Sequence, residues 1–171
     1  MAIAALGADK PGLVSDITHF IFDYGCDIED SRMIAMNGEF ALIIQVSGVW
    51  NAVAKLESSL PVLESRLGLK LMSKRLSLRQ KNAELLPYEI DVVALDHPGI
   101  VYHLANFFSE RKINIEELST SCYSAAHTGA PMFSVHMEVG IPGDIQLAEL
   151  KDAFLDFCDN LNLDAAIEPI K

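Results

Sequence analysis

The stretch Asp9-Lys10-Pro11-Gly12-Leu13-Val14 occurs a second time, as Asp96-His97-Pro98-Gly99-Ile100-Val101, and this repeat decides the fold. Around it, seven of the 23 residues in 9–31 are identical to their counterparts in 96–118, at a constant offset of 87. From Phe40 and Phe133 the offset is 93, so the second copy has gained six residues near Ala125–Pro131. Spacing that is kept apart from one loop insertion indicates a duplication.

Both copies show the same order of apolar segments. A short apolar run predicts a buried first strand, and residues at helical spacing follow the Asp-x-Pro-Gly turn. Asn37-Gly38 predicts a tight hairpin between the next two strands of the first copy. Pro61 is expected to end the second helix of that copy, leaving 62–67 as a separate helical turn. The expected strands are 3–8, 26–36, 39–47 and 69–78, then 88–95, 113–124, 132–139 and 164–170; the expected second helices are 49–60 and 145–161.

The βαββαβ order predicts an α+β fold. We expect two tandem ferredoxin-like domains, each a four-stranded antiparallel sheet with two helices on one face. The first domain is expected at 1–80, a polar linker at 81–87 and the second domain at 88–171. Because a unit of this size has a small core, its uncovered sheet face or sheet edge should pack against another copy of the unit. The second repeat supplies such a neighbour within one chain. A monomer and a homodimer of chains both fit this pattern.

The net charge of −11 is concentrated in the second half of the chain. Residues 1–80 contain 8 Lys and Arg against 9 Asp and Glu, whereas residues 81–171 contain 5 against 15. A half-chain with a charge of −10 repels phosphate backbones, so direct binding of nucleic acid is not expected. The surplus marks either a face for a basic protein partner or a solubilising surface, and both interpretations stay open.

Composition also bears on the compartment. No apolar run reaches the roughly 20 residues of a membrane span, and the N-terminus has no basic segment of a signal peptide. Cys26, Cys122 and Cys158 are widely spaced and form no CxxC pair. These features predict a cytoplasmic protein with reduced thiols and no membrane contact.

The Asp-x-Pro-Gly turns are the candidate binding sites. Each leads into a helix whose first N–H groups and dipole favour an anion, such as the carboxylate of an amino acid. Gly12 and Gly99 would let a small molecule approach the backbone closely. Asp9 or Asp27 could then hold the ammonium group, and Asn114 could do so as a neutral group in the second copy. The structural alternative is that Asp caps the helix, Pro starts it and Gly fits a tight bend.

An active site is not supported. His97 and His103, beside Asp96, are the only histidines in one neighbourhood, and the chain has no metal-ligand spacing, P-loop or Gly-x-Ser-x-Gly motif. Acylphosphatases share the predicted layout but need an Arg in the loop after the first strand, where this chain has acidic turns without Arg. We therefore expect a protein that is not an enzyme and has no catalytic residue, metal site or cofactor.

The repeated turns also carry a family resemblance. Two Asp-x-Pro-Gly-[Leu/Ile]-Val turns, each followed by Asp/Asn-Ile-Glu at a strand start, resemble tandem ACT domains. This resemblance implies βαββαβ modules that often bind amino acids at interfaces between copies. Residues 5–14, 25–32 and 47–52 further resemble bacterial ACT-domain repressors of transcription. The similarity is dense over 3–75 and is mostly one of pattern over 85–171.

That narrower resemblance implies an accessory regulator without its own DNA-binding domain. Such a protein acts on a separate DNA-binding transcriptional activator in response to an amino acid, here glycine. The second copy has Asn114 where the first has Asp27, whose carboxylate would repel that of a ligand, so the two sites need not both function. The alternative keeps the fold without the ligand, as a protein–protein interaction module. The resemblance places ligand residues at Asp9, Gly12, Leu13, Asp96, Gly99, Ile100 and Asn114.

Overall fold

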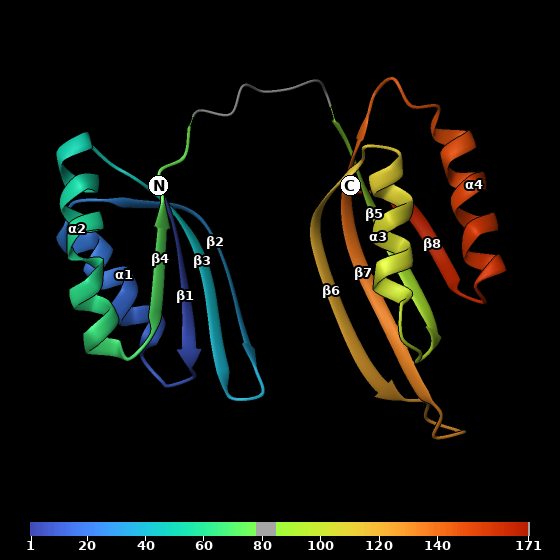
Figure 1. Ribbon diagram of the computed structural model, residues 1–171, viewed down its shortest axis with the longest axis horizontal. Helices are drawn as coiled ribbons and strands as arrows, with labels where there is room; N and C mark the ends of the chain where they lie inside the picture. The colour runs from blue at the N-terminus through green and yellow to red at the C-terminus, as the bar shows by residue number, and fades with distance from the viewer. Residues whose placement is uncertain (78–84, 171) are drawn as a thin grey trace. The chain divides into compact units, whose positions relative to one another are not determined.

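The computed structural model describes residues 1–77 and 85–170, which belong to two compact units, Met1–Arg79 and Gln80–Lys171 (Figure 1). Each unit has the element order βαββαβ. Unit 1 contains β1 (Ala2–Ala8), α1 (Leu13–Asp23), β2 (Asp27–Met36), β3 (Glu39–Ser47), α2 (Trp50–Leu67) and β4 (Lys70–Lys74). Unit 2 contains β5 (Leu85–Leu95), α3 (Ile100–Glu110), β6 (Asn114–Ser124), β7 (Pro131–Pro142), α4 (Leu147–Asn160) and β8 (Asp164–Pro169).

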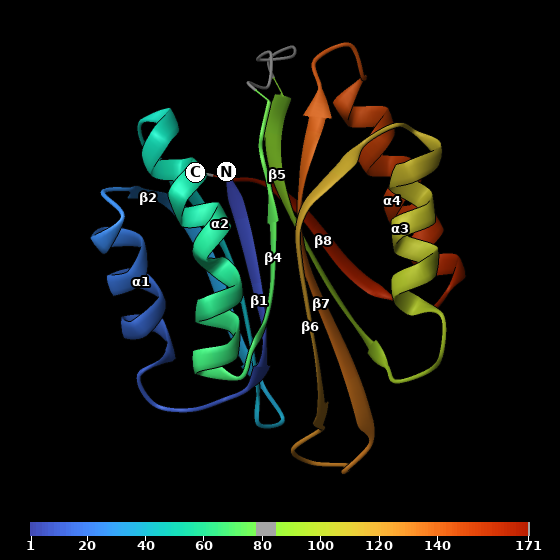
Figure 2. The same cartoon turned by 60° about the vertical axis from the view of Figure 1, so that its left-hand side comes forward.

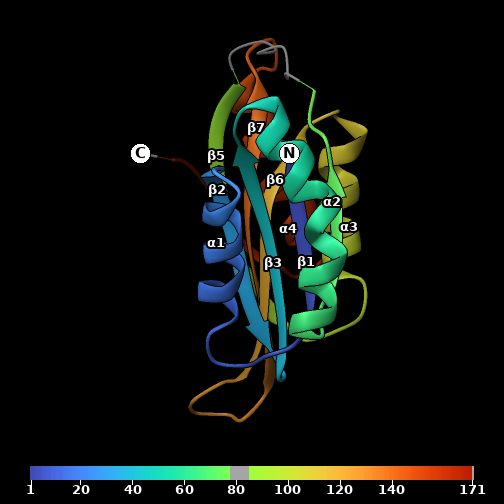
Figure 3. The ribbon, with the colours of Figure 1, turned by 90° about the vertical axis from the view of Figure 1, so that its left-hand side faces the viewer.

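Each unit is a two-layer sandwich of one sheet and two helices. The strand orders are β2-β3-β1-β4 in unit 1 and β6-β7-β5-β8 in unit 2, and all the strand pairs are antiparallel. Both helices of a unit lie on the same face of its sheet, as Figure 3 shows for α1 and α2 and Figure 2 for α3 and α4. The α+β, ferredoxin-like prediction is therefore confirmed, and the opposite face of each sheet is left without a helix.

Equivalent positions of the two copies form the two cores. Helix α1 buries Leu13, Ile17, Phe20 and Ile21, and helix α3 buries Ile100, Leu104, Phe107 and Phe108 at the same offset of 87. Strands alternate between buried and exposed side chains, as in β3. In unit 2, the rings of Phe107, Phe108 and Phe154 lie 5.2–5.3 Å apart between centroids. The apolar residues found at helical spacing in the sequence are thus the ones that α1 and α3 bury against their sheets.

Helix α2 differs from the prediction. It continues through Pro61 as one helix of 18 residues and ends at Gly68, whose φ is 70°. Leu60 and Leu63 are buried on either side of Pro61, and the Glu64 carboxylate accepts hydrogen bonds from Leu71 N at 2.8 Å and Lys70 Nζ at 3.3 Å. The burial of Leu60 and Leu63 and the hydrogen bonds from β4 to Glu64 offset the backbone hydrogen bond that proline removes.

Strand and linker limits also differ. Strand β5 begins at Leu85, three residues earlier than expected, so Leu85–Pro87 of the expected linker pair with β7; residues 81–84 lie outside the described residues. Strand β4 ends at Lys74 rather than at Leu78, which also lies outside them. The Asn37-Gly38 hairpin is confirmed, with φ of 52° and 81°, as a tight turn with two positive φ angles requires. Among the described residues, no helix is long and apolar enough to cross a bilayer.

Candidate functional site

The Asp-x-Pro-Gly turns place glycine at the N-cap of α1 and α3. Gly12 has φ 96° and Gly99 has φ 101°, a left-handed conformation that costs a residue with a side chain about 1–2 kcal/mol. Neither helix has a side-chain cap. Instead, the backbone N–H of Asp9 donates to Gly38 O at 2.8 Å, and that of Asp96 donates to Pro131 O at 2.9 Å. The Asp cap of the structural alternative is therefore wrong, whereas its glycine in a tight bend is confirmed.

The residue after each turn glycine, Leu13 or Ile100, could contact a ligand only through its backbone. The side chains of both residues are buried in the two cores, and the Leu13 N–H already donates to Lys10 O at 3.5 Å. A Cβ at Gly12 would meet no atom within 4 Å, whereas one at Gly99 would lie 3.5 Å from the His103 ring. Asp9 and Asp96 are exposed. The turns thus present exposed carboxylates beside helix N-termini, which favour anions.

Asp27 and Asn114 lie at the opposite end of their sheets from these turns. Asp27 pairs with Ser47, whereas Ala8, just before the turn, pairs with Glu39 at the other end of β3. The eight steps between those partners correspond to about 26 Å. Asn114 and Leu95 are likewise separated along β7. Because one glycine cannot reach both ends of a unit, the expectation that Asp27 or Asn114 completes the turn site of its own unit is wrong.

A pocket of about 460 Å³ does surround Asn114 in unit 2. It lies where α3 ends and β6 begins, and its lining consists of Ala105, Ser109, Lys112, Ile113, Asn114 and Ile115. Lys112 follows the last turn of α3 with φ 57°, in the left-handed region, and its N–H donates to Ser109 O at 3.0 Å. Glycine (Gly25, φ 67°) occupies the equivalent position in unit 1. A lysine in this conformation is strained by roughly 1 kcal/mol relative to glycine.

Lys112 and Asn114 both line this pocket, and Glu116 contacts Asn114 beside it. Asn114 Nδ2 donates to Glu116 Oε1 at 2.8 Å. The register of β6 against β7 shifts between Ile115 and Glu117, so Glu116 occupies a β-bulge, the kind of irregularity that often re-aims a side chain. The Lys112 ammonium can attract a carboxylate, and the Asn114 oxygen and Glu116 carboxylate can attract an ammonium group. The arrangement suits a zwitterion.

Sequence reasoning found Asn114 but missed Ser109, Lys112 and Glu116. The sequence feature that could have indicated this site is the replacement of Gly25 in the first copy by Lys112 in the second. In unit 1 the positions equivalent to Ser109 and Asn114 hold Phe22, which is 75% exposed, and Asp27. Apolar and anionic groups therefore replace hydroxyl and amide groups at the same end of the unit.

The histidines belong to other arrangements. His97 Nδ1 contacts Pro98 O at 3.2 Å, and His103 packs against the Tyr102 ring. Among the described residues, no three His, Cys, Asp or Glu side chains are grouped so that they could hold a metal ion. His136 Nδ1 lies 2.8 Å from Asp91 Oδ1, and this hydrogen bond raises the pKa of His136, with Glu89 and Glu138 adding to the effect.

The comparisons with known proteins agree with this architecture. A family model described as ACT domain matches residues 1–74. The glycine cleavage system transcriptional repressor of Escherichia coli (strain K12) is 31% identical over 170 residues, which cover 99% of this chain and 90% of that protein.

Two solved structures also match. A crystal structure provisionally assigned as a glycine cleavage system transcriptional repressor is 26% identical, has a TM-score of 0.76 and covers 99% of this chain and 96% of that one. An unknown protein from Galdieria sulphuraria is 25% identical with a TM-score of 0.79, over 99% of this chain and 97% of the other. The chain belongs to the ACT-domain family of the glycine cleavage system transcriptional repressor, whose named members are regulatory rather than catalytic proteins.

Proposed function

We propose that the protein is an amino-acid-responsive regulator of transcription that binds its ligand in the pocket between α3 and β6 and acts through a separate DNA-binding activator. One observation carries the proposal: a cation, Lys112, lies in the same pocket as Asn114, whose amide is hydrogen-bonded to the Glu116 carboxylate. An α-amino acid presents a carboxylate and an ammonium group a few ångströms apart. The pocket offers a group of matching character to each.

Glycine is the proposed ligand because the relatives are named for the glycine cleavage system. The volume of about 460 Å³ also admits larger amino acids. Selectivity for glycine would thus depend on the polar groups and on what covers the open pocket when ligand is bound. The Asp-x-Pro-Gly turns are a second place for an anion, about 26 Å away along the sheet.

Isothermal titration of glycine into the protein tests the ligand, with Lys112→Gly as the decisive variant. This substitution removes the ammonium group and relieves the left-handed backbone, so it should weaken glycine binding while raising the free energy of unfolding. A merely structural lysine would not separate affinity from stability in this way. Asn114→Asp, which copies unit 1, should also weaken binding, and Asp27→Asn in unit 1 should leave it unchanged. An absence of heat with every amino acid would refute amino-acid sensing.

The partner part of the proposal rests on the family and on charge. Residues 81–171 carry the charge of −10, which favours a basic protein surface over nucleic acid. A mobility-shift assay with the activator of the glycine cleavage genes and its promoter should change when the protein is added, and change again with glycine. The protein alone should shift no DNA. The proposed compartment is the cytoplasm, where Cys26, Cys122 and Cys158 would stay reduced.

A ligand-free interaction module is the second candidate. Unit 1 favours it, because large apolar side chains such as Phe22, Trp50 and Met72 are exposed there. Binding of the activator that is equally tight with and without amino acids, together with silent titrations, would support this module over a sensor.

A further inference from the structure

The uncovered face of the unit 2 sheet carries a row of four glutamates. Glu89 on β5 lies directly opposite Glu168 on β8 and Glu138 on β7, and Glu138 lies opposite Glu117 on β6. Neighbours in such a row are about 5 Å apart at Cα, and like charges directly opposite one another are destabilising. Asp91 and Asp164 add two more carboxylates to the same face, one and two rows further on.

The same face of unit 1 has the opposite chemistry. At the positions equivalent to the glutamate row stand Lys74, Ala2, Gln45 and Asp30. The next two rows contain four large apolar side chains that are 50–75% exposed: Met72, Ile43, Leu6 and Ile34. Arg32 flanks them on β2, whereas the ammonium group of Lys70 on β4 pairs with Glu64 of α2.

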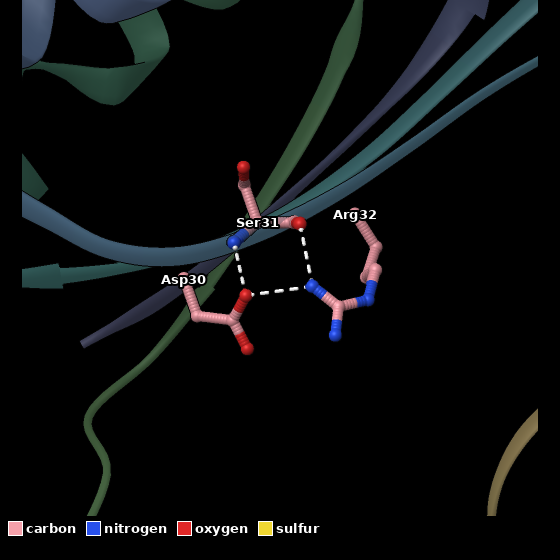
Figure 4. A network of polar contacts seen from close by, with 3 residues as sticks. All are labelled: Asp30, Ser31 and Arg32. Carbon is pink, nitrogen blue, oxygen red and sulfur yellow. Dashed lines mark hydrogen bonds and ion pairs between the residues drawn. The ribbon is translucent and has the colours of Figure 1, made fainter. Parts of the chain in front are cut away.

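Arg32 is held in place on this face. Its Nη1 donates to Asp30 Oδ1 at 2.7 Å and to Ser31 O at 3.0 Å, and Ser31 N donates to the same carboxylate oxygen at 2.8 Å (Figure 4). The guanidinium is therefore held against Asp30 and Ser31 of its own strand, while Ile43 is the cross-strand neighbour of Arg32 at Cα. The unit 1 face combines an apolar centre with Lys74 and with an Arg32 that is paired with Asp30, whereas the unit 2 face is strongly negative.

We propose that two copies of the chain pair reciprocally, with the uncovered face of unit 1 in each copy covering the uncovered face of unit 2 in the other. Lys74 and Arg32 would then face the glutamate row, and the four exposed apolar side chains would leave water. Each chain carries one face of each kind, so a two-fold arrangement uses all four faces and closes on itself.

Interface size favours two contacts rather than one. A four-stranded face five residues long measures roughly 20 by 17 Å, or about 340 Å² in projection. A stable interface buries about 800 Å² per partner. Two reciprocal contacts would cover about twice 340 Å² on each chain, which approaches the area of a stable interface. One contact alone would cover less than half of it.

Charge reversal on either face tests the pairing, with the mass of the full chain measured by sedimentation equilibrium. One variant combines Arg32→Glu with Lys74→Glu; the other combines Glu89→Lys with Glu138→Lys. Either variant alone places like charges across both contacts, so its dimer should dissociate roughly ten-fold or more readily than the original. In a one-to-one mixture, one contact has both faces reversed and the other has neither, so a mixed dimer should form as tightly as the original.

Matched controls reverse exposed charges on the helical side. Lys55→Glu on α2 and Asp152→Lys on α4 should dimerise as the original chain does, and far-UV circular dichroism should show that every variant is folded. A monomeric original protein at micromolar concentration would overturn the proposal. So would charge-reversed variants that dimerise normally, or variants whose dimers fail to return on mixing. The inference goes beyond amino-acid sensing, because glycine can bind whether or not the chain dimerises.

Discussion

Units 1 and 2 share a core and differ on their surfaces. The buried positions of α1 and α3 are apolar in both, and both helices begin at a glycine with φ near 100°. By contrast, the end of the first helix holds Phe22, Gly25 and Asp27 in unit 1 but Ser109, Lys112 and Asn114 in unit 2. The uncovered sheet faces differ equally, one apolar and basic, the other acidic. Duplication therefore preserved the scaffold, while the exposed positions of the two units came to differ in chemistry.

The largest expected effect tests whether the two cores are independent. Phe154 is fully buried against Phe107 and Phe108, so Phe154→Ala should destabilise unit 2 by about 3–5 kcal/mol. Trp50, the single tryptophan, reports on unit 1. In denaturant, circular dichroism should show an earlier transition of unit 2, while the midpoint of Trp50 fluorescence stays unchanged. A shared shift of both signals would show that the cores unfold as one.

A smaller effect is expected at the two turns, where the copies should behave alike. Gly12→Ala and Gly99→Ala each place a side chain at a left-handed φ and should each cost about 1–2 kcal/mol. Gly99→Ala should cost about the same, since its Cβ would lie 3.5 Å from the His103 ring, an ordinary van der Waals distance. The free energies of unfolding from urea titrations check both values. A neutral Gly12→Ala would mean that this turn readily adopts another conformation.

The free energy of unfolding should depend on pH near neutrality in unit 2 but not in unit 1. The folded-state pKa of His136 is raised chiefly by its hydrogen bond to Asp91, so the contribution of this pair is fully present below the unfolded-state pKa, about 6.5. It is lost as the pH rises through the higher folded-state pKa. Unit 1 has Ile43 at this position and lacks the effect. Denaturant titrations across neutral pH should show the slope in unit 2, and His136→Gln should abolish it.

The smallest expected difference concerns the thiols. Burial raises the pKa of Cys158 to about 12, with Asp159 adding to the effect, and it also raises the pKa of Cys26, next to Asp27. Cys122 is exposed. A thiol reagent should therefore label Cys122 first in the native protein, and mass spectrometry can locate the label. Rapid labelling of Cys158 would contradict the packing of α4.

The sequence predicted most of the fold because duplication and periodicity are properties of the chain itself. The helical stripes, the Asn37-Gly38 turn and the strand order follow from local patterns, and the copies confirm one another. Helix α2 was misjudged because burial of Leu60 and Leu63 on either side of Pro61 is a tertiary effect. The separation of Asp27 and Asn114 from the turns was missed for a similar reason, since they are near in sequence but lie at opposite ends of a helix of 11 residues.

The glutamate row could not be read from the sequence either. Its members, Glu89, Glu117, Glu138 and Glu168, are far apart along the chain and meet only through strand register. Net charge indicated an acidic half without showing which face would carry it. Lys112 was overlooked, although its exchange with Gly25 is visible in the sequence, because only the fold shows that it lines one pocket with Ser109 and Asn114.

The central claim is that the two copies share a fold but only unit 2 carries the amino-acid pocket. Titrating glycine into the ¹⁵N-labelled protein and following backbone amide signals tests it most directly. The account predicts chemical-shift changes centred on residues 109–116, with residues 22–29 of unit 1 unaffected. Changes centred on residues 22–29, or on neither segment, would contradict it.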